Sequence, residues 1–126
     1  MYRITLLSLA SLLFLNPLMA QNANPYNGTW TVSFDGKRTV DLEGSVVVKD
    51  DGGSWNMVAR SGRNPCVGRM YPIAVDKATA DELTFTVNRA KTLAGCQDST
   101  YTFKKIDDKT LTGEIGEGRT ASLVRK

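Results

Sequence analysis

The chain has 126 residues, of which 16 are Lys or Arg and 13 are Asp or Glu, so its formal net charge is +3, and it has no histidine. A nearly balanced charge argues against a nucleic-acid-binding protein, whose affinity comes from a clustered basic face. The lack of histidine excludes Ser-His-Asp catalysis, Cys-His catalysis and histidine-ligated metal sites. We therefore expect no cofactor, no metal and no catalytic residues.

The N-terminal segment has the features of a cleavable signal peptide. Arg3 precedes an apolar run over residues 4–15, and the segment that ends at Ala20 fits a signal peptidase site. The run is shorter than the roughly 20 apolar residues that a permanent membrane span needs. We expect residues 1–20 to be removed and residues 21–126 to form one exported domain, periplasmic or extracellular, without a permanent membrane span.

Beyond the leader, apolar and polar residues alternate, and turn-forming Gly, Asp and Asn separate the runs, which predicts eight strands. Their inward positions are, in chain order, Trp30, Val32 and Phe34; Val40, Leu42, Gly44, Val46 and Val48; Trp55, Met57 and Ala59; the run Met70 to Val75; Leu83, Phe85 and Val87; Tyr101 and Phe103; Leu111, Gly113 and Ile115; and Ala121 and Leu123. We expect a bend or bulge at Gly44, and Pro72 weakens the fourth strand because proline cannot donate to a ladder.

The short turns between these strands favour antiparallel neighbours, and eight strands in a meander can close on themselves. The sequence thus predicts an all-β domain, a small antiparallel eight-stranded up-and-down barrel. A two-sheet β-sandwich is the alternative, because alternation alone does not distinguish the two. With two Trp, two Phe and a Tyr directed inward, we expect a packed core without room for a lipid-sized ligand.

The only two cysteines, Cys66 and Cys96, lie in the exported part of the chain, and an even count there predicts a disulfide. A metal pair or a redox pair is disfavoured, because the chain has neither histidine nor a C-x-x-C motif. Closing a loop of about 30 residues stabilises a domain by roughly 3 to 4 kcal/mol.

The two connections that contain the cysteines also carry a group of basic and amide side chains. These are Arg60, Arg63, Asn64, Arg69, Arg89, Lys91 and Gln97. Clustered arginines can bind carboxylates or phosphates in a bidentate manner, although a solvated loop region would have a similar composition. We hypothesise that these residues bind an unknown protein or a small anionic ligand or glycan.

The run Asn27-Gly28-Thr29-Trp30 resembles the G-x-W start of the first strand in calycins, the superfamily of lipocalins, fatty-acid-binding proteins and avidins. The resemblance implies a barrel in which this tryptophan closes one end beneath an arginine from a late strand. Arg119 and Arg125 are the candidates for that arginine. The chain is shorter than a lipocalin and has no other lipocalin motif, so ligand transport is not carried over.

The predicted domain also resembles, in kind, the small periplasmic inhibitors of host lysozymes, whose inhibitory loop has the pattern S-G-x-x-Y. Ser61-Gly62 begins in the same way, but Pro65 occupies the tyrosine position. We therefore expect an exported, monomeric, non-enzymatic binding module whose contact surface is the disulfide-tied loops. An inhibitor of a host or rival hydrolase such as lysozyme is one alternative. A small hydrolase with a carboxylate pair in a cleft is the other.

Overall fold

A computed structural model describes residues 23–35, 43–58, 64–115 and 118–126. Eight strands lie in these ranges, and all eight predicted runs are among them. The strands are β1 (Gly28–Asp35), β2 (Glu43–Lys49), β3 (Gly52–Met57), β4 (Met70–Ala78), β5 (Glu82–Val87), β6 (Ser99–Asp107), β7 (Thr110–Glu114) and β8 (Thr120–Arg125). The expected signal peptide and the expected inward positions Val40, Leu42 and Ala59 lie outside the described residues.

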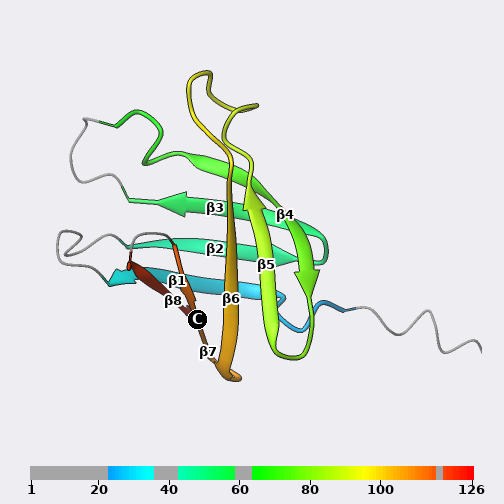
Figure 1. Ribbon diagram of the computed structural model, residues 1–126. Coiled ribbons are helices and arrows are strands. Elements are labelled where there is room, and N and C mark those ends of the chain that lie inside the picture. Colours follow the sequence, from blue (N-terminus) through cyan, green and yellow to red (C-terminus); the bar gives the residue numbers. More distant parts are fainter. Residues whose placement is uncertain (1–22, 36–42, 59–63, 116–117) are drawn as a thin grey trace, which may run out of the picture.

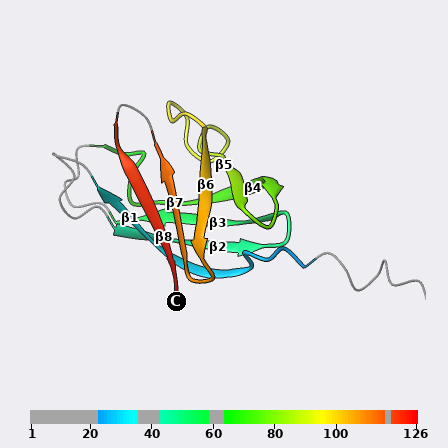
Figure 2. The same ribbon diagram turned by 60° about the horizontal axis from the view of Figure 1, so that its bottom comes forward.

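The eight strands form a closed antiparallel barrel in which each strand pairs with its neighbours in sequence (Figure 1). The pairing of β1 with β8, from Trp30 opposite Arg125 to Asp35 opposite Thr120, closes the sheet. This closure confirms the up-and-down barrel and shows that the β-sandwich alternative is wrong. Figure 2 shows β8, β7 and β6 side by side across the front of the barrel.

Side chains fill the middle of the barrel. Val32, Leu83, Phe85, Phe103, Leu111 and Leu123 are all completely buried there. The rings of Phe85 and Phe103 stack with their centroids 5.6 Å apart. Each such side chain contributes about 1.5 to 3 kcal/mol when it is fully removed from water. Any space for a ligand therefore lies toward the ends of the barrel.

Gly44 does not mark a bulge, because the register continues unbroken from Gly44, opposite Met57, along β2 and β3. A Cβ atom at this position would collide with the Met57 side chain and the Asn56 carbonyl. The glycine thus permits close packing of neighbouring strands. The register shifts of the described strands lie at residues 75–77 of β4 and 105–107 of β6.

Pro72 sits inside β4 at a place where its missing N–H costs little. Its carbonyl accepts a hydrogen bond of 3.0 Å from the N–H of Asn88, one residue beyond the end of β5 at Val87. The N and O atoms of one residue point to the same side of an antiparallel strand. The missing donor therefore faces the end of the β5 ladder and not the β3 strand.

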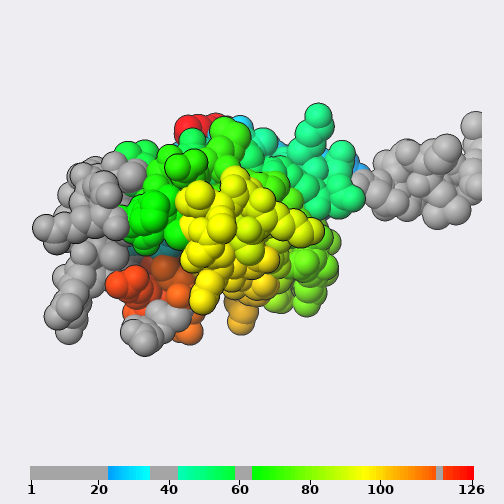
Figure 3. Space-filling view, turned by 90° about the horizontal axis from the view of Figure 1, so that it is seen from above, coloured from blue at the N-terminus to red at the C-terminus, as the bar shows by residue number. Residues whose placement is uncertain are grey.

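The barrel has two different ends. At the end we call the mouth, four connections join consecutive strands: residues 36–42, 58–69, 88–98 and 115–119. The opposite end, which we call the plug end, contains residues 23–27, the turns at 50–51, 79–81 and 108–109, and Lys126. Seen from above, the yellow atoms of the 88–98 connection lie against the green atoms of the segment that begins at residue 64 (Figure 3).

Candidate functional site

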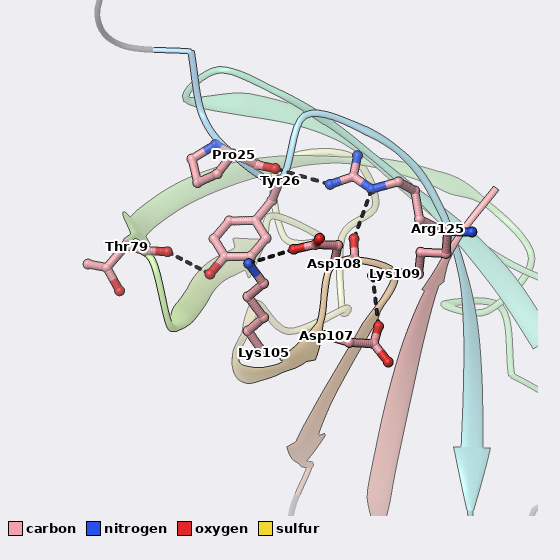
Figure 4. Close-up of polar contacts among 8 residues, drawn as sticks. All are labelled: Pro25, Tyr26, Thr79, Lys105, Asp107, Asp108, Lys109 and Arg125. Atoms are coloured by element: carbon pink, nitrogen blue, oxygen red, sulfur yellow. Dashed lines mark hydrogen bonds and ion pairs between the residues drawn. The ribbon is translucent and has the colours of Figure 1, made fainter.

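At the plug end, an arginine covers a tryptophan. The guanidinium carbon of Arg125 lies 4.3 Å from the ring centroid of Trp30, which is 1% exposed. The Arg125 Nη1 atom donates to the Asn27 carbonyl at 2.6 Å. Its Nη2 atom donates to the Pro25 carbonyl at 3.0 Å (Figure 4). Of the two arginines that the calycin resemblance suggested, Arg125 holds this position, whereas Arg119 lies at the mouth. The charge of Arg125 is thus used to tie the N-terminal segment to the barrel.

Three more polar side chains of the plug end have partners. The Tyr26 hydroxyl donates to the Thr79 carbonyl at 2.6 Å, and burial raises the pKa of this hydroxyl. The Lys105 ammonium lies 3.0 Å from the Asp108 carboxylate, which raises the pKa of Lys105 and lowers that of Asp108. These groups border a hollow of about 530 Å³. Because they bind one another, the plug end has the features of a structural closure.

The predicted disulfide between Cys66 and Cys96 is present, with a Cα to Cα distance of 5.7 Å. It joins the two longest mouth connections. The Tyr71 hydroxyl donates to the Cys66 carbonyl at 2.7 Å, and the Asn64 Oδ1 atom accepts from the Cys66 N–H at 2.9 Å. Asn64, predicted to bind a ligand, therefore uses its side-chain oxygen to shape the loop. These contacts hold both connections against the barrel.

A hollow of about 350 Å³, which we call the outer hollow, lies beside the disulfide. Its lining includes both cysteines and four of the predicted binding residues, Asn64, Arg69, Arg89 and Gln97. Lys91 is exposed and does not line it. Arg60 and Arg63, and also Ser61 and Gly62 of the inhibitor-like pattern, lie outside the described residues. The structure thus brings together four of the seven predicted binding residues.

A second hollow, of about 230 Å³, adjoins the first and is called the inner hollow. It is lined by Phe34, Trp55, Met57, Val67, Arg89, Tyr101, Ile115 and Arg119, and the outer hollow shares four of these residues. The sequence prediction placed Phe34, Trp55 and Tyr101 in a packed core; Trp55 is buried as predicted, whereas Phe34 and Tyr101 are only partly buried at this hollow. The sequence signal for this partial exposure was that Phe34 and Tyr101 lie near the mouth ends of β1 and β6.

Arg89 lies between the two hollows and is held by neutral groups. Its Nη1 atom donates to the Ser99 hydroxyl at 2.7 Å and the Gln97 carbonyl at 3.3 Å, and its Nη2 atom donates to the Tyr101 hydroxyl at 3.4 Å. Its guanidinium carbon lies 5.7 Å from the centroid of the Tyr71 ring. Among the described residues, no ion pair neutralises Arg89, and no carboxylate lines either hollow.

The charges of the connecting segments differ between the two ends. The described residues of the mouth connections include four cations, Arg69, Arg89, Lys91 and Arg119, and one carboxylate, Asp98. The plug-end segments contain four carboxylates, Asp50, Asp51, Asp81 and Asp108, and two cations, Lys109 and Lys126. The topology therefore gathers positive charge at the mouth, although the whole chain is nearly balanced.

Comparison with family models, curated protein sequences and solved structures finds no match for this chain. Within the described ranges, no helix is long and apolar enough to cross a bilayer. No group of three or more potential metal ligands occurs in the same ranges. The functional argument therefore depends on the geometry and charge of the mouth.

Proposed function

We propose that this chain is an exported, monomeric, non-enzymatic binding module whose mouth binds an anionic partner. The observation that carries the proposal is Arg89, a half-buried cation whose guanidinium is held by neutral groups and forms no ion pair among the described residues. The Asp98 carboxylate accepts from the backbone N–H of Arg89 at 2.8 Å and not from its guanidinium. Arg69 and Arg119 line the hollows on either side. An arginine fork of this kind suits carboxylate, sulfate or phosphate groups.

Export is supported by the disulfide together with the signal-peptide features of residues 1–20. Disulfides persist in oxidising compartments, and this one determines how the two longest mouth connections are held. Kinship with the calycins is part of the same hypothesis. It is supported by the closed barrel and by Arg125 over Trp30.

Binding is favoured over catalysis by the chemistry of the mouth lining. General acid–base catalysis needs a group that can take and return a proton near neutral pH, most often a histidine or a carboxylate. The chain has no histidine, and the described lining of both hollows has guanidinium, amide, phenol and apolar groups. Such groups recognise an anion without transforming it.

The test is retention of the purified, oxidised protein on immobilised dextran sulfate. We expect the double variant Arg69→Ser/Arg119→Ser to elute at clearly lower salt than the unmodified protein, because mouth charge provides the contact and salt screens it. The matched control, Lys109→Ser/Lys126→Ser, removes two cations from the plug end and should elute close to the unmodified protein. Equal shifts for the two double variants would contradict the proposal, because retention would then depend only on net charge.

A further inference from the structure

We propose that the inner hollow binds a small organic anion with a flat apolar body, such as an aromatic carboxylate or sulfonate. This inference depends on the proposed function, because it names the ligand class for the same mouth. The inference differs from the proposed function because it requires the ligand to have an apolar body as well as a negative charge. A polyanion that contacts only the outer arginines would not need the inner hollow at all.

The apolar half of the proposed site is a wall of incompletely covered hydrophobic side chains. Five partly buried hydrophobic residues pack against the core, and four of them, Phe34, Val67, Tyr101 and Ile115, line the inner hollow. The Tyr101 ring stacks on Trp55 with a centroid distance of 5.3 Å, and Phe34 meets Trp55 edge-on at 6.3 Å. A flat ring laid against this wall would gain aromatic contacts and remove apolar surface from water.

The charged half of the site consists of Arg89 and Arg119, which line the same hollow. A guanidinium has five N–H donors, and the contacts of Arg89 with Ser99, Gln97 and Tyr101 use three of them. Two donors of Arg89 thus have no hydrogen-bond partner among the described residues. Because its existing contacts already hold the fork in place, an incoming carboxylate would lose little entropy in ordering it.

The size of the ligand is limited by the barrel beneath the hollow. Phe85 and Phe103 are completely buried below the Trp55 and Tyr101 rings, so the space does not continue into the interior. The inner hollow adjoins the outer hollow, with which it shares four lining residues. A long acyl chain therefore has no place to extend, whereas a body of one or two rings fits.

The experiment uses three probes: 2-naphthoate, its neutral amide 2-naphthamide, and inorganic sulfate. We expect saturable binding of 2-naphthoate by calorimetry, binding of the amide about tenfold or more weaker, because charge-assisted hydrogen bonds are lost, and no saturable binding of sulfate. Equal affinity for the acid and the amide, or no saturable binding of either, would overturn the inference.

The two tryptophans report where the probe binds, because Trp55 lines the inner hollow and Trp30 lies at the plug end. In a ¹H–¹⁵N spectrum assigned with Trp55→Phe, 2-naphthoate should move the Trp55 indole signal and leave that of Trp30 in place. A shift confined to Trp30 would overturn the inference.

Variants complete the test. Arg119→Gln should weaken 2-naphthoate about tenfold while leaving the amide unchanged, whereas Lys104→Gln, which removes a cation from an exposed position of β6, should change neither. An equal loss in both variants would contradict a role for the mouth.

If the protein is retained on dextran sulfate but does not bind 2-naphthoate, only the inference fails. If it does neither, the proposed function fails as well.

Discussion

Each end of the barrel has a tryptophan and an arginine, but the two arginines differ in the groups that accept their hydrogen bonds. At the plug end, Arg125 covers Trp30 and donates to backbone carbonyls. At the mouth, Arg89 is steadied by neutral side chains and one carbonyl, and Trp55 borders an open hollow. The same residue types thus cover one end of the barrel and border a hollow at the other.

The largest effect that should separate the two ends comes from the disulfide. Replacing both Cys66 and Cys96 with serine should lower the free energy of unfolding by about 3 to 4 kcal/mol, because the unfolded chain regains the freedom of a loop of about 30 residues. Denaturant titration would measure this loss. Because the disulfide joins only mouth connections, 2-naphthoate binding should be lost while the indole signal of Trp30 stays unchanged in the folded variant. A simultaneous change at Trp30 would show that the two ends are not independent.

The next largest effect is the difference in stability between variants of two arginines, Arg125 in β8 and Arg119 in the mouth connection that precedes it. Arg125→Met should lower the free energy of unfolding by about 2 to 3 kcal/mol, because charged hydrogen bonds to carbonyls and the contact with Trp30 are lost. Arg119→Met should change it by less than about 0.5 kcal/mol, because Arg119 is exposed. Thermal or denaturant unfolding of the two variants measures both values. Similar losses in the two variants would contradict the division into a structural and a binding arginine.

The smallest effect concerns the plug end at high pH. Tyr26→Phe removes the hydrogen bond to the Thr79 carbonyl and should cost about 1 kcal/mol at neutral pH. Burial raises the pKa of Tyr26, so the unfolded chain releases this proton first and stability should fall as the pH rises above about 10. Unfolding measured from pH 8 to 11 should show a shallower fall in the variant. An unchanged slope would mean that Tyr26 titrates alike in both states.

The strand pattern was readable from the sequence because a half-buried strand alternates between core and solvent. The set Trp30, Val32 and Phe34 was placed correctly on one inward face by this rule. The rule does not say how near a strand end a residue lies, and for that reason Phe34 and Tyr101 were expected in a filled core. Both side chains are only partly buried, and both line the inner hollow.

The choice between Arg119 and Arg125 also shows that alternation does not tell which end of the barrel a residue occupies. Both residues share the parity of the inward positions Ala121 and Leu123, so alternation admits either as the partner of Trp30. The antiparallel pairing of β1 with β8 puts Arg125 opposite Trp30 and leaves Arg119 at the mouth. Strand direction and register, which are set by the closure of the sheet, determine that Arg125 and not Arg119 lies beside Trp30.

The sequence by itself therefore determined the class of the domain, its eight strands and the only possible disulfide, because these depend on local alternation, turn residues and a cysteine count of two. Only the tertiary structure decided which end of the barrel is closed and which is open. That decision depends on contacts between residues far apart in the chain, such as Arg125 with Asn27 and Cys66 with Cys96. Barrel closure also brings Arg69, Arg89 and Arg119 from three separate connections to the two adjoining hollows, and this arrangement is the basis of the proposed function.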